Sequence, residues 1–221
     1  MGTKALATGD VGAAIRQFSL QAGYAELADI DLGHARGKNP SYPLAIIAYN
    51  NLALAFAVKG DYLRAKLWSL VALRWDKENK DALSNLEHIE EKLKDWKWPK
   101  TPEGEYLQYA GRGDWDSIIV EPSPPDKVHF CFSGLWWGLG EGPSGLGELT
   151  ATIPLHDGQA EYTSREFTGN KCLISIHFYP DRLEVKQTGT DFDCGFGHNV
   201  MAAGTFQRIG ARANCPTGGR Q

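Results

Sequence analysis

The spacing of apolar residues changes near residue 99, and this change predicts two domains. In residues 1–98 apolar positions recur at helical spacing, as Ala14, Ile15 and Phe18 do. From residue 105 onward they alternate with polar positions, which is typical of β-strands. We therefore predict an α+β protein with two domains. Its parts are a helical domain at 1–98, a short linker at 99–104, an antiparallel β-barrel or sandwich at 105–209 and a polar tail at 210–221.

The helical half contains a long apolar run that is interrupted by Gly60-Asp61. Glycine commonly ends a helix and aspartate commonly caps the next one, so this dipeptide predicts a helical hairpin. A connection rich in Gly, Asn and Pro is expected from Gly33 to Pro43. A closing helix with a charged outer face is expected at 81–95.

The β half contains eight short segments with alternating apolar positions, and each is predicted to be a strand. They are Glu105–Tyr109, Trp115–Glu121, Lys127–Trp137, Gly147–Leu155, Gly158–Thr163, Lys171–Tyr179, Arg182–Thr188 and Val200–Arg208. About eight short strands with tight turns favour an antiparallel barrel or sandwich. Gly195 and Gly197, beside Cys194, predict a bulge or a close approach of two backbone segments.

Charge is divided unevenly between the halves. Residues 1–100 hold 14 basic and 12 acidic side chains, whereas residues 101–221 hold 9 and 15. The acidic surplus argues against a nucleic-acid partner and favours a basic protein partner, or else it serves only solubility. No apolar run approaches the length of a membrane span, and no signal peptide is recognisable after Met1.

All four cysteines lie in the β half, which favours disulfides and an oxidising compartment, with four reduced thiols as the alternative. We predict a bridge between Cys172 and Cys194, which flank a strand pair, while the pairing of Cys131 with Cys215 stays open. Cys172, His177, Cys194 and His198 match a zinc set by count. Residues five apart on a strand point to opposite faces, so no metal and no other cofactor is predicted.

No catalytic set is recognisable, since Ser133 and Ser144 lack the setting of a nucleophile, and we expect a non-enzymatic protein. The glycine-rich residues 138–145 are expected to form a mobile loop with Trp136 and Trp137 at its base. One tryptophan should face the core, and the other should face solvent and anchor a partner, with the alternative that both pack against neighbouring loops. The predicted protein-binding residues of this loop region are Trp136, Trp137, Glu141, Ser144 and Glu148.

The helical hairpin resembles a tetratricopeptide repeat. Tyr49, Leu52, Ala53 and Phe56 match the first helix of that repeat, and Gly60, Asp61, Tyr62, Ala65 and Ala72 match its turn and second helix. The resemblance implies a concave peptide-binding groove, while the alternative is that the same residues only pack a scaffold. The implied groove residues are Asn50, Leu54, Ala57 and Val58.

The β half resembles the small β-domain of bacterial lysozyme-inhibitor-type envelope proteins. The residues that carry this resemblance are Ala160, Tyr162, Cys172, Cys194-Gly195-Phe196-Gly197 and Gly204-Thr205-Phe206. It implies a periplasmic or secreted binding protein, with a cytoplasmic location as the alternative.

The leading hypothesis is an inhibitor or immunity protein that binds a basic cell-wall hydrolase or a secreted toxin. One alternative is an assembly scaffold that uses the helical groove. A second alternative is a small-ligand carrier or an enzyme that uses the barrel interior.

Overall fold

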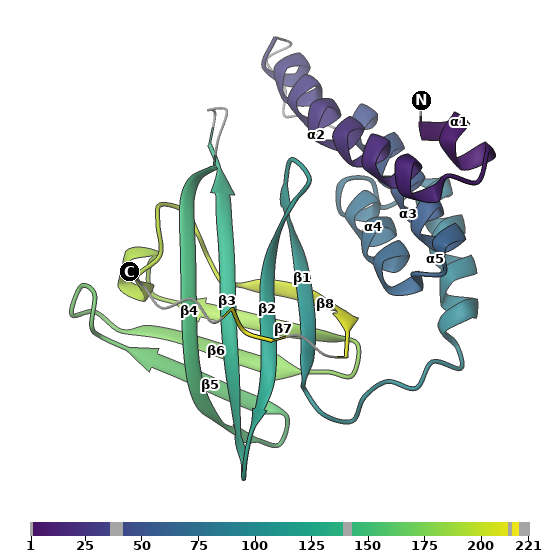
Figure 1. The fold of residues 1–221 in the computed structure, drawn as a ribbon. Helices are drawn as coiled ribbons and strands as arrows, with labels where there is room; N and C mark the ends of the chain where they lie inside the picture. The colour runs from purple at the N-terminus through teal and green to yellow at the C-terminus, as the bar shows by residue number, and fades with distance from the viewer. Residues whose placement is uncertain (1, 36–41, 139–142, 212–213, 217–221) are drawn as a thin grey trace. The chain divides into compact units, whose positions relative to one another are not determined.

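The computed structural model describes residues 2–35, 42–138, 143–211 and 214–216 (Figure 1). The chain divides into two compact units. The first comprises Met1–Lys97 with Gly111–Gly113, and the second comprises Trp98–Ala110 and Asp114–Gln221. Five α-helices precede eight strands in the described part of the chain, so the predicted α+β class is confirmed. None of the helices in these described ranges is long and apolar enough to cross a membrane.

The helical unit is a series of antiparallel neighbours in which α2 packs against α3, α3 against α4, and α4 against α5. Its helices are α1 (Gly2–Ala7), α2 (Val11–Ala35), α3 (Pro43–Lys59), α4 (Tyr62–Trp75) and α5 (Lys80–Leu93). The predicted break separates α3 from α4. Gly60 adopts a left-handed conformation with φ 82°, and Asp61 accepts a hydrogen bond from the Arg64 backbone N–H.

The connection predicted from Gly33 to Pro43 is wrong at both ends, because α2 continues through Gly33 to Ala35 and α3 begins at Pro43. A single glycine inside a helix costs only about 1 kcal/mol, which tertiary packing readily offsets. The rest of that connection, residues 36–41, lies outside the described residues. The expected closing helix is α5, which begins after the N-cap residue Asn79.

The N-terminus of α3 is capped by a residue of another helix. Tyr42, which precedes α3, makes no side-chain cap hydrogen bond. Instead Oδ2 of Asp29 in α2 accepts hydrogen bonds from the backbone N–H groups of Leu44 and Ala45, each at 3.0 Å. Asp29 is buried, and a carboxylate at this position also interacts favourably with the helix dipole. The contact therefore fixes where α3 begins relative to α2.

We expect Asp29→Ala to lower the free energy of unfolding of the helical unit by about 1–3 kcal/mol, because two buried N–H groups lose their acceptor. Asp29→Asn keeps one acceptor oxygen and should cost less. Urea unfolding followed by far-ultraviolet circular dichroism measures the difference. Asp31→Ala, on the exposed side of α2, is the matched control, and an equal loss at both positions would contradict the capping role.

The β unit is a closed antiparallel barrel in which each strand pairs with the next and β8 pairs with β1 (Figure 1). The predicted bounds of the third and seventh strands are those observed. The strands are β1 (Gly104–Gly111), β2 (Asp114–Ser123), β3 (Lys127–Trp137), β4 (Pro143–His156), β5 (Gln159–Ser164), β6 (Cys172–Phe178), β7 (Arg182–Thr188) and β8 (Gly204–Gly210).

Side chains from all eight strands form one buried cluster inside this barrel. Fully burying a large apolar side chain contributes roughly 1.5–3 kcal/mol, so the cluster is the main source of stability of the β unit. Its largest members include Tyr106, Ile118, Val120, Val128, Phe130, Phe132, Ile153, Ile174, Ile176, Leu183 and Phe206.

The other six strands differ from their predicted bounds, and two of them, β4 and β8, begin four residues away from the predicted start. β8 begins at Gly204 rather than Val200, because the Ala202 N–H donates to the side-chain Oε1 of Gln187 on β7 at 2.8 Å instead of to a backbone carbonyl of that strand. β4 begins at Pro143 rather than Gly147, so the last residues of the predicted glycine-rich loop are in fact strand residues. Residues 139–142 lie outside the described residues.

Glycines allow the segment after the short helix η1 (Phe192–Cys194) to cross β4. The Gly197 N–H donates to the Leu146 carbonyl at 2.8 Å. A Cβ on Gly197 would lie 2.6 Å from that carbonyl oxygen, and one on Gly147 would lie 2.8 Å from a Val200 methyl group. The close backbone approach predicted beside Cys194 is therefore observed.

Both pairs of cysteines form disulfides. Cys172 is bonded to Cys194, as predicted, and this bridge is part of the barrel core. Cys131 is bonded to Cys215, which attaches the C-terminal segment to β3. The first bridge therefore holds η1 against β6, and the second holds a segment that belongs to no strand.

Asp193 fixes η1 to the neighbouring loop through its buried carboxylate. The carboxylate accepts hydrogen bonds from the Thr168 hydroxyl, from the Thr190 N–H at 2.8 Å and from Nδ2 of Asn170 at 3.2 Å. These bonds, that of Thr168 most of all, hold the pKa of Asp193 well below its usual range.

Because the pKa of Asp193 is lower in the folded than in the unfolded chain, its contribution to stability is complete above the unfolded value of about 3.9. The contribution is lost as the pH falls further, through the folded-state pKa. We therefore expect Asp193→Asn to show a shallower loss of stability than the parent between about pH 4 and pH 2. Urea unfolding at several pH values tests this, with the exposed Asp126→Asn as control. Parallel pH curves for Asp193→Asn and the parent would contradict it.

Candidate protein-binding groove

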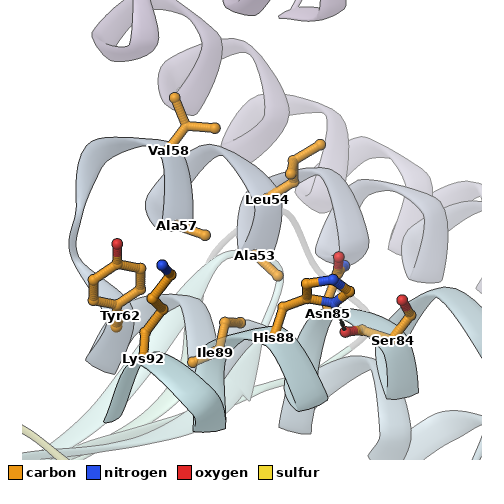
Figure 2. A pocket seen from close by; sticks show the side chains of 10 residues that line it. All are labelled: Ala53, Leu54, Ala57, Val58, Tyr62, Ser84, Asn85, His88, Ile89 and Lys92. Carbon is orange, nitrogen blue, oxygen red and sulfur yellow. Dashed lines mark hydrogen bonds between the residues drawn. The ribbon is translucent and has the colours of Figure 1, made fainter.

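A cavity of about 360 Å³ lies between α3 and α5 (Figure 2). Its floor is apolar, since Ala53 and Ile89 are buried and Ala57 and Tyr62 pack against the cluster that contains Ile89. Alanines on α3 leave this space open because their side chains are short. The residues that line the cavity are Ala53, Leu54, Ala57, Val58, Tyr62, Ser84, Asn85, His88, Ile89 and Lys92.

Three of the four groove residues implied by the tetratricopeptide resemblance line this cavity, namely Leu54, Ala57 and Val58. Asn50 does not line it. Its Nδ2 donates to Oδ1 of Asn79 at 2.9 Å, and that same oxygen caps α5 by accepting from the Ala82 N–H. Asn50 therefore joins α3 to the beginning of α5 beside the cavity.

Apolar side chains continue along the exposed face of α3 beyond the cavity. Leu44, Ile47, Leu54 and Val58 are 43%, 54%, 45% and 57% exposed. Together with Asn51 they follow one another at intervals of three and four residues, as the a and d positions of a heptad repeat do. We call these five residues the α3 stripe, and it extends about 21 Å at 1.5 Å per residue.

The α3 stripe differs from an ordinary solvent-facing helix surface because it contains no charge. The first charged residue of α3 is Lys59, its last residue. Solvent-facing helix positions normally carry charged or polar side chains, and a continuous exposed apolar surface indicates an interaction site. The stripe was missed as a whole because the resemblance drew attention only to residues 50–58.

The rim of the cavity is basic. Lys92 and His88 lie on the α5 side, and no carboxylate among the described residues lines the cavity (Figure 2). Nδ1 of His88 lies 2.8 Å from the Ser84 carbonyl oxygen, so this ring is held against its own helix. Lys92 forms no ion pair with any residue in the described ranges. The cavity thus combines an apolar floor with a cation, Lys92, that can form an ion pair with a carboxylate of a ligand.

The two tryptophans predicted on the barrel are both half-buried, so the expectation of one in the core and one in solvent is wrong. Trp136 packs against the barrel core, and Trp137 lies beside Asp114, whose pKa is raised by burial. The pairing of β3 with β4 shifts register between these tryptophans, with Ser144 as the extra residue. Such a bulge increases the local twist and disturbs simple alternation.

Two other residues of the predicted barrel contact share one exposed face of β4. Ser144 and Glu148 are exposed on β4, and Ser144 belongs to a strand rather than to the expected loop. Glu141 lies outside the described residues. The strand thus presents Ser144 and Glu148 to solvent on either side of Leu146, which is 64% exposed.

A cluster of rings beside Leu146 was missed by the sequence analysis. The His198 ring centroid lies 5.5 Å from that of Trp136 and 6.3 Å from that of Phe192, which is 54% exposed. We call Trp136, Phe192 and His198 the barrel aromatic cluster, and exposed Leu146 lies next to it on β4, where its carbonyl accepts from the Gly197 N–H. The segment that crosses β4 brings these residues together, and the glycines of both segments were the available signal.

Comparison of the chain with protein-family models, with curated proteins and with solved structures gives no match. The groove and the barrel aromatic cluster must therefore be interpreted from their own chemistry. The cysteines and histidines considered as a zinc set do not form one in the described ranges, where Cys172 and Cys194 are bonded to each other. A different group, His129 with Cys131 and Cys215, has the spacing of metal ligands.

Proposed function

We propose that this is a non-enzymatic protein-binding protein whose helical unit receives an amphipathic helix of a partner. The observation that supports this most directly is the uncharged, exposed α3 stripe beside the α3–α5 cavity. Helices dock into apolar grooves through side chains at i, i+3, i+4 and i+7, which is the spacing that the stripe presents. The tetratricopeptide resemblance of the hairpin agrees with this proposal.

The chemistry of the groove specifies the partner helix. Apolar residues at its heptad positions would cover Leu44, Ile47, Leu54 and Val58, and one of them would enter the cavity. A polar residue opposite Asn51 would set the register, as a buried asparagine does in coiled coils. An acidic residue would lie opposite Lys92, whose charge has no partner in the described ranges. The partner is therefore an acidic amphipathic helix.

A designed helix of about three heptads, with leucine at a and d and glutamate elsewhere, tests the groove. We expect it to bind the full chain and to lose at least tenfold in affinity against Leu54→Arg/Val58→Arg, as fluorescence anisotropy measures. Leu83→Arg, a substitution at an equally exposed leucine of α5 outside the cavity, should leave binding unchanged. Absence of binding, or equal losses for both variants, would contradict the proposal.

The barrel aromatic cluster favours a second contact, with a basic protein such as a cell-wall hydrolase or a secreted toxin. Exposed Leu146 and Phe192 supply apolar anchors, and the surrounding half of the chain is acidic. Aromatic anchors with complementary charge are typical of protein interfaces. Two disulfides favour an oxidising compartment, and we propose the periplasm or the extracellular space.

A lysozyme serves as the probe for this second contact, because it is a basic cell-wall hydrolase. We expect the full chain to inhibit it in a cell-wall lysis assay, and Leu146→Asp/Phe192→Asp to reduce the inhibition at least tenfold. Thr163→Asp, on the exposed face of β5, adds a negative charge elsewhere and should inhibit as the parent does. Inhibition that is absent, or insensitive to the double substitution, would contradict this role of the cluster.

A further inference from the structure

Three potential metal ligands meet on the outer surface of the barrel. The ring nitrogens of His129 and the sulfur atoms of Cys131 and Cys215 include a set of three atoms that all lie within 4.8 Å of one another. Val128 and Phe130 point into the core, so His129 and Cys131, which alternate with them on β3, lie on the outer face. Cys215 comes from the C-terminal segment, which crosses this face.

The ring of His129 is oriented as a metal ligand would be. Its Nδ1 lies 2.9 Å from the hydroxyl of Thr152, which is its cross-strand neighbour on β4. In the tautomer in which Nδ1–H donates to that hydroxyl, the lone pair of Nε2 is free and lies 3.9 Å from Sγ of Cys131. Histidines that bind metals are usually held by such a hydrogen bond on the other ring nitrogen.

The position of Cys215 is also fixed independently of the disulfide. Its backbone N–H donates to Oε1 of Glu121 at 3.0 Å. Glu121 on β2 lies directly across from His129 in the strand pairing, so the same small area holds both the histidine and the segment that carries Cys215. Opening the disulfide would therefore leave Cys215 with a contact that keeps it near the other two residues.

We propose that reduction of the Cys131–Cys215 disulfide turns the two cysteines and His129 into a binding site for one zinc-class divalent ion. A dithiol reductant supplies two electrons and two protons, so that the S–S bond breaks, two cysteine thiols form and the reductant becomes a disulfide. Binding of the ion to both sulfurs and to Nε2 of His129 then releases two protons. Two thiolates and an imidazole are ligands that Zn²⁺ prefers, and its fourth position stays open to water.

The observed distances suit this change. Tetrahedral bonds of about 2.3 Å to sulfur and about 2.0 Å to nitrogen place neighbouring S and N ligands roughly 3.5 Å apart. Nε2 of His129 and Sγ of Cys131 are already 3.9 Å apart, so the largest change is the separation of the two bonded sulfurs to about 3.7 Å. The C-terminal segment is thus held on β3 by a covalent bond under oxidising conditions and by an ion under reducing ones.

Cobalt titration of the full chain tests the site, because thiolate ligands give Co²⁺ a strong charge-transfer absorption. After treatment with a phosphine reductant we expect one equivalent of Co²⁺ to bind with that absorption and to be displaced by Zn²⁺. The oxidised chain should show none. In a protease assay, reduced protein should lose its C-terminal segment faster without Zn²⁺ than with it.

Three variants make the test specific. His129→Ala should weaken Co²⁺ binding at least tenfold, whereas His156→Ala, at an exposed histidine elsewhere on the barrel, should not change it. Cys131→Ser/Cys215→Ser should abolish the charge-transfer band. In Cys172→Val/Cys194→Ala only the Cys131–Cys215 pair can be reduced, so binding by this variant excludes the core cysteines. A reduced chain without the band, or with a band unaffected by His129→Ala, would overturn the proposal.

Discussion

The packing of α3 determines the architecture of the helical unit, because this helix contacts α2, α4 and α5. Its contact surface is made largely of alanines, with Ile46, Tyr49 and Leu52 as the large buried side chains. Small residues let neighbouring helices approach closely, and Asp29 and Asn79 add polar contacts at either side. Since these contacts occupy only part of the circumference of α3, its remaining face stays exposed although it is apolar.

The barrel depends on a different constraint. The segment that follows η1 must cross β4 at close distance, with the two backbones in contact. Glycines on β4 and in the crossing segment remove the side chains that would collide, and Cys172–Cys194 holds the start of the crossing in the core. The same crossing sets His198 against Trp136. A feature that closes the fold therefore also creates the exposed barrel aromatic cluster, so changes to these glycines would affect both stability and surface.

Local signals in the sequence predicted most of the fold, because each acts over a few residues. Period-two alternation located all eight strands, and Gly60-Asp61 located the helical hairpin. The errors arose where distant residues decide the outcome. Gln187 ends the pairing of β8 early, and pairing with β3 makes the end of an apparent glycine loop part of β4. The tetratricopeptide resemblance selected Leu54, Ala57 and Val58, which line the cavity. No sequence pattern could select Phe192 and His198, because they are more than 50 residues from Trp136 and only folding brings the three rings together.

The two candidate surfaces differ in chemistry and in what can alter them. The α3 stripe is uncharged and apolar, and its unit contains no cysteine, so neither ionic strength nor thiol reagents should affect its apolar character. The β half carries the acidic surplus and all four cysteines, so contacts made there depend on salt and on redox conditions. On the proposed function, a helix bound at α3 would stay in place while the contact of the barrel responds to salt and redox conditions. The two proposed contacts would therefore be controlled independently, because they lie on different units and have different chemistry.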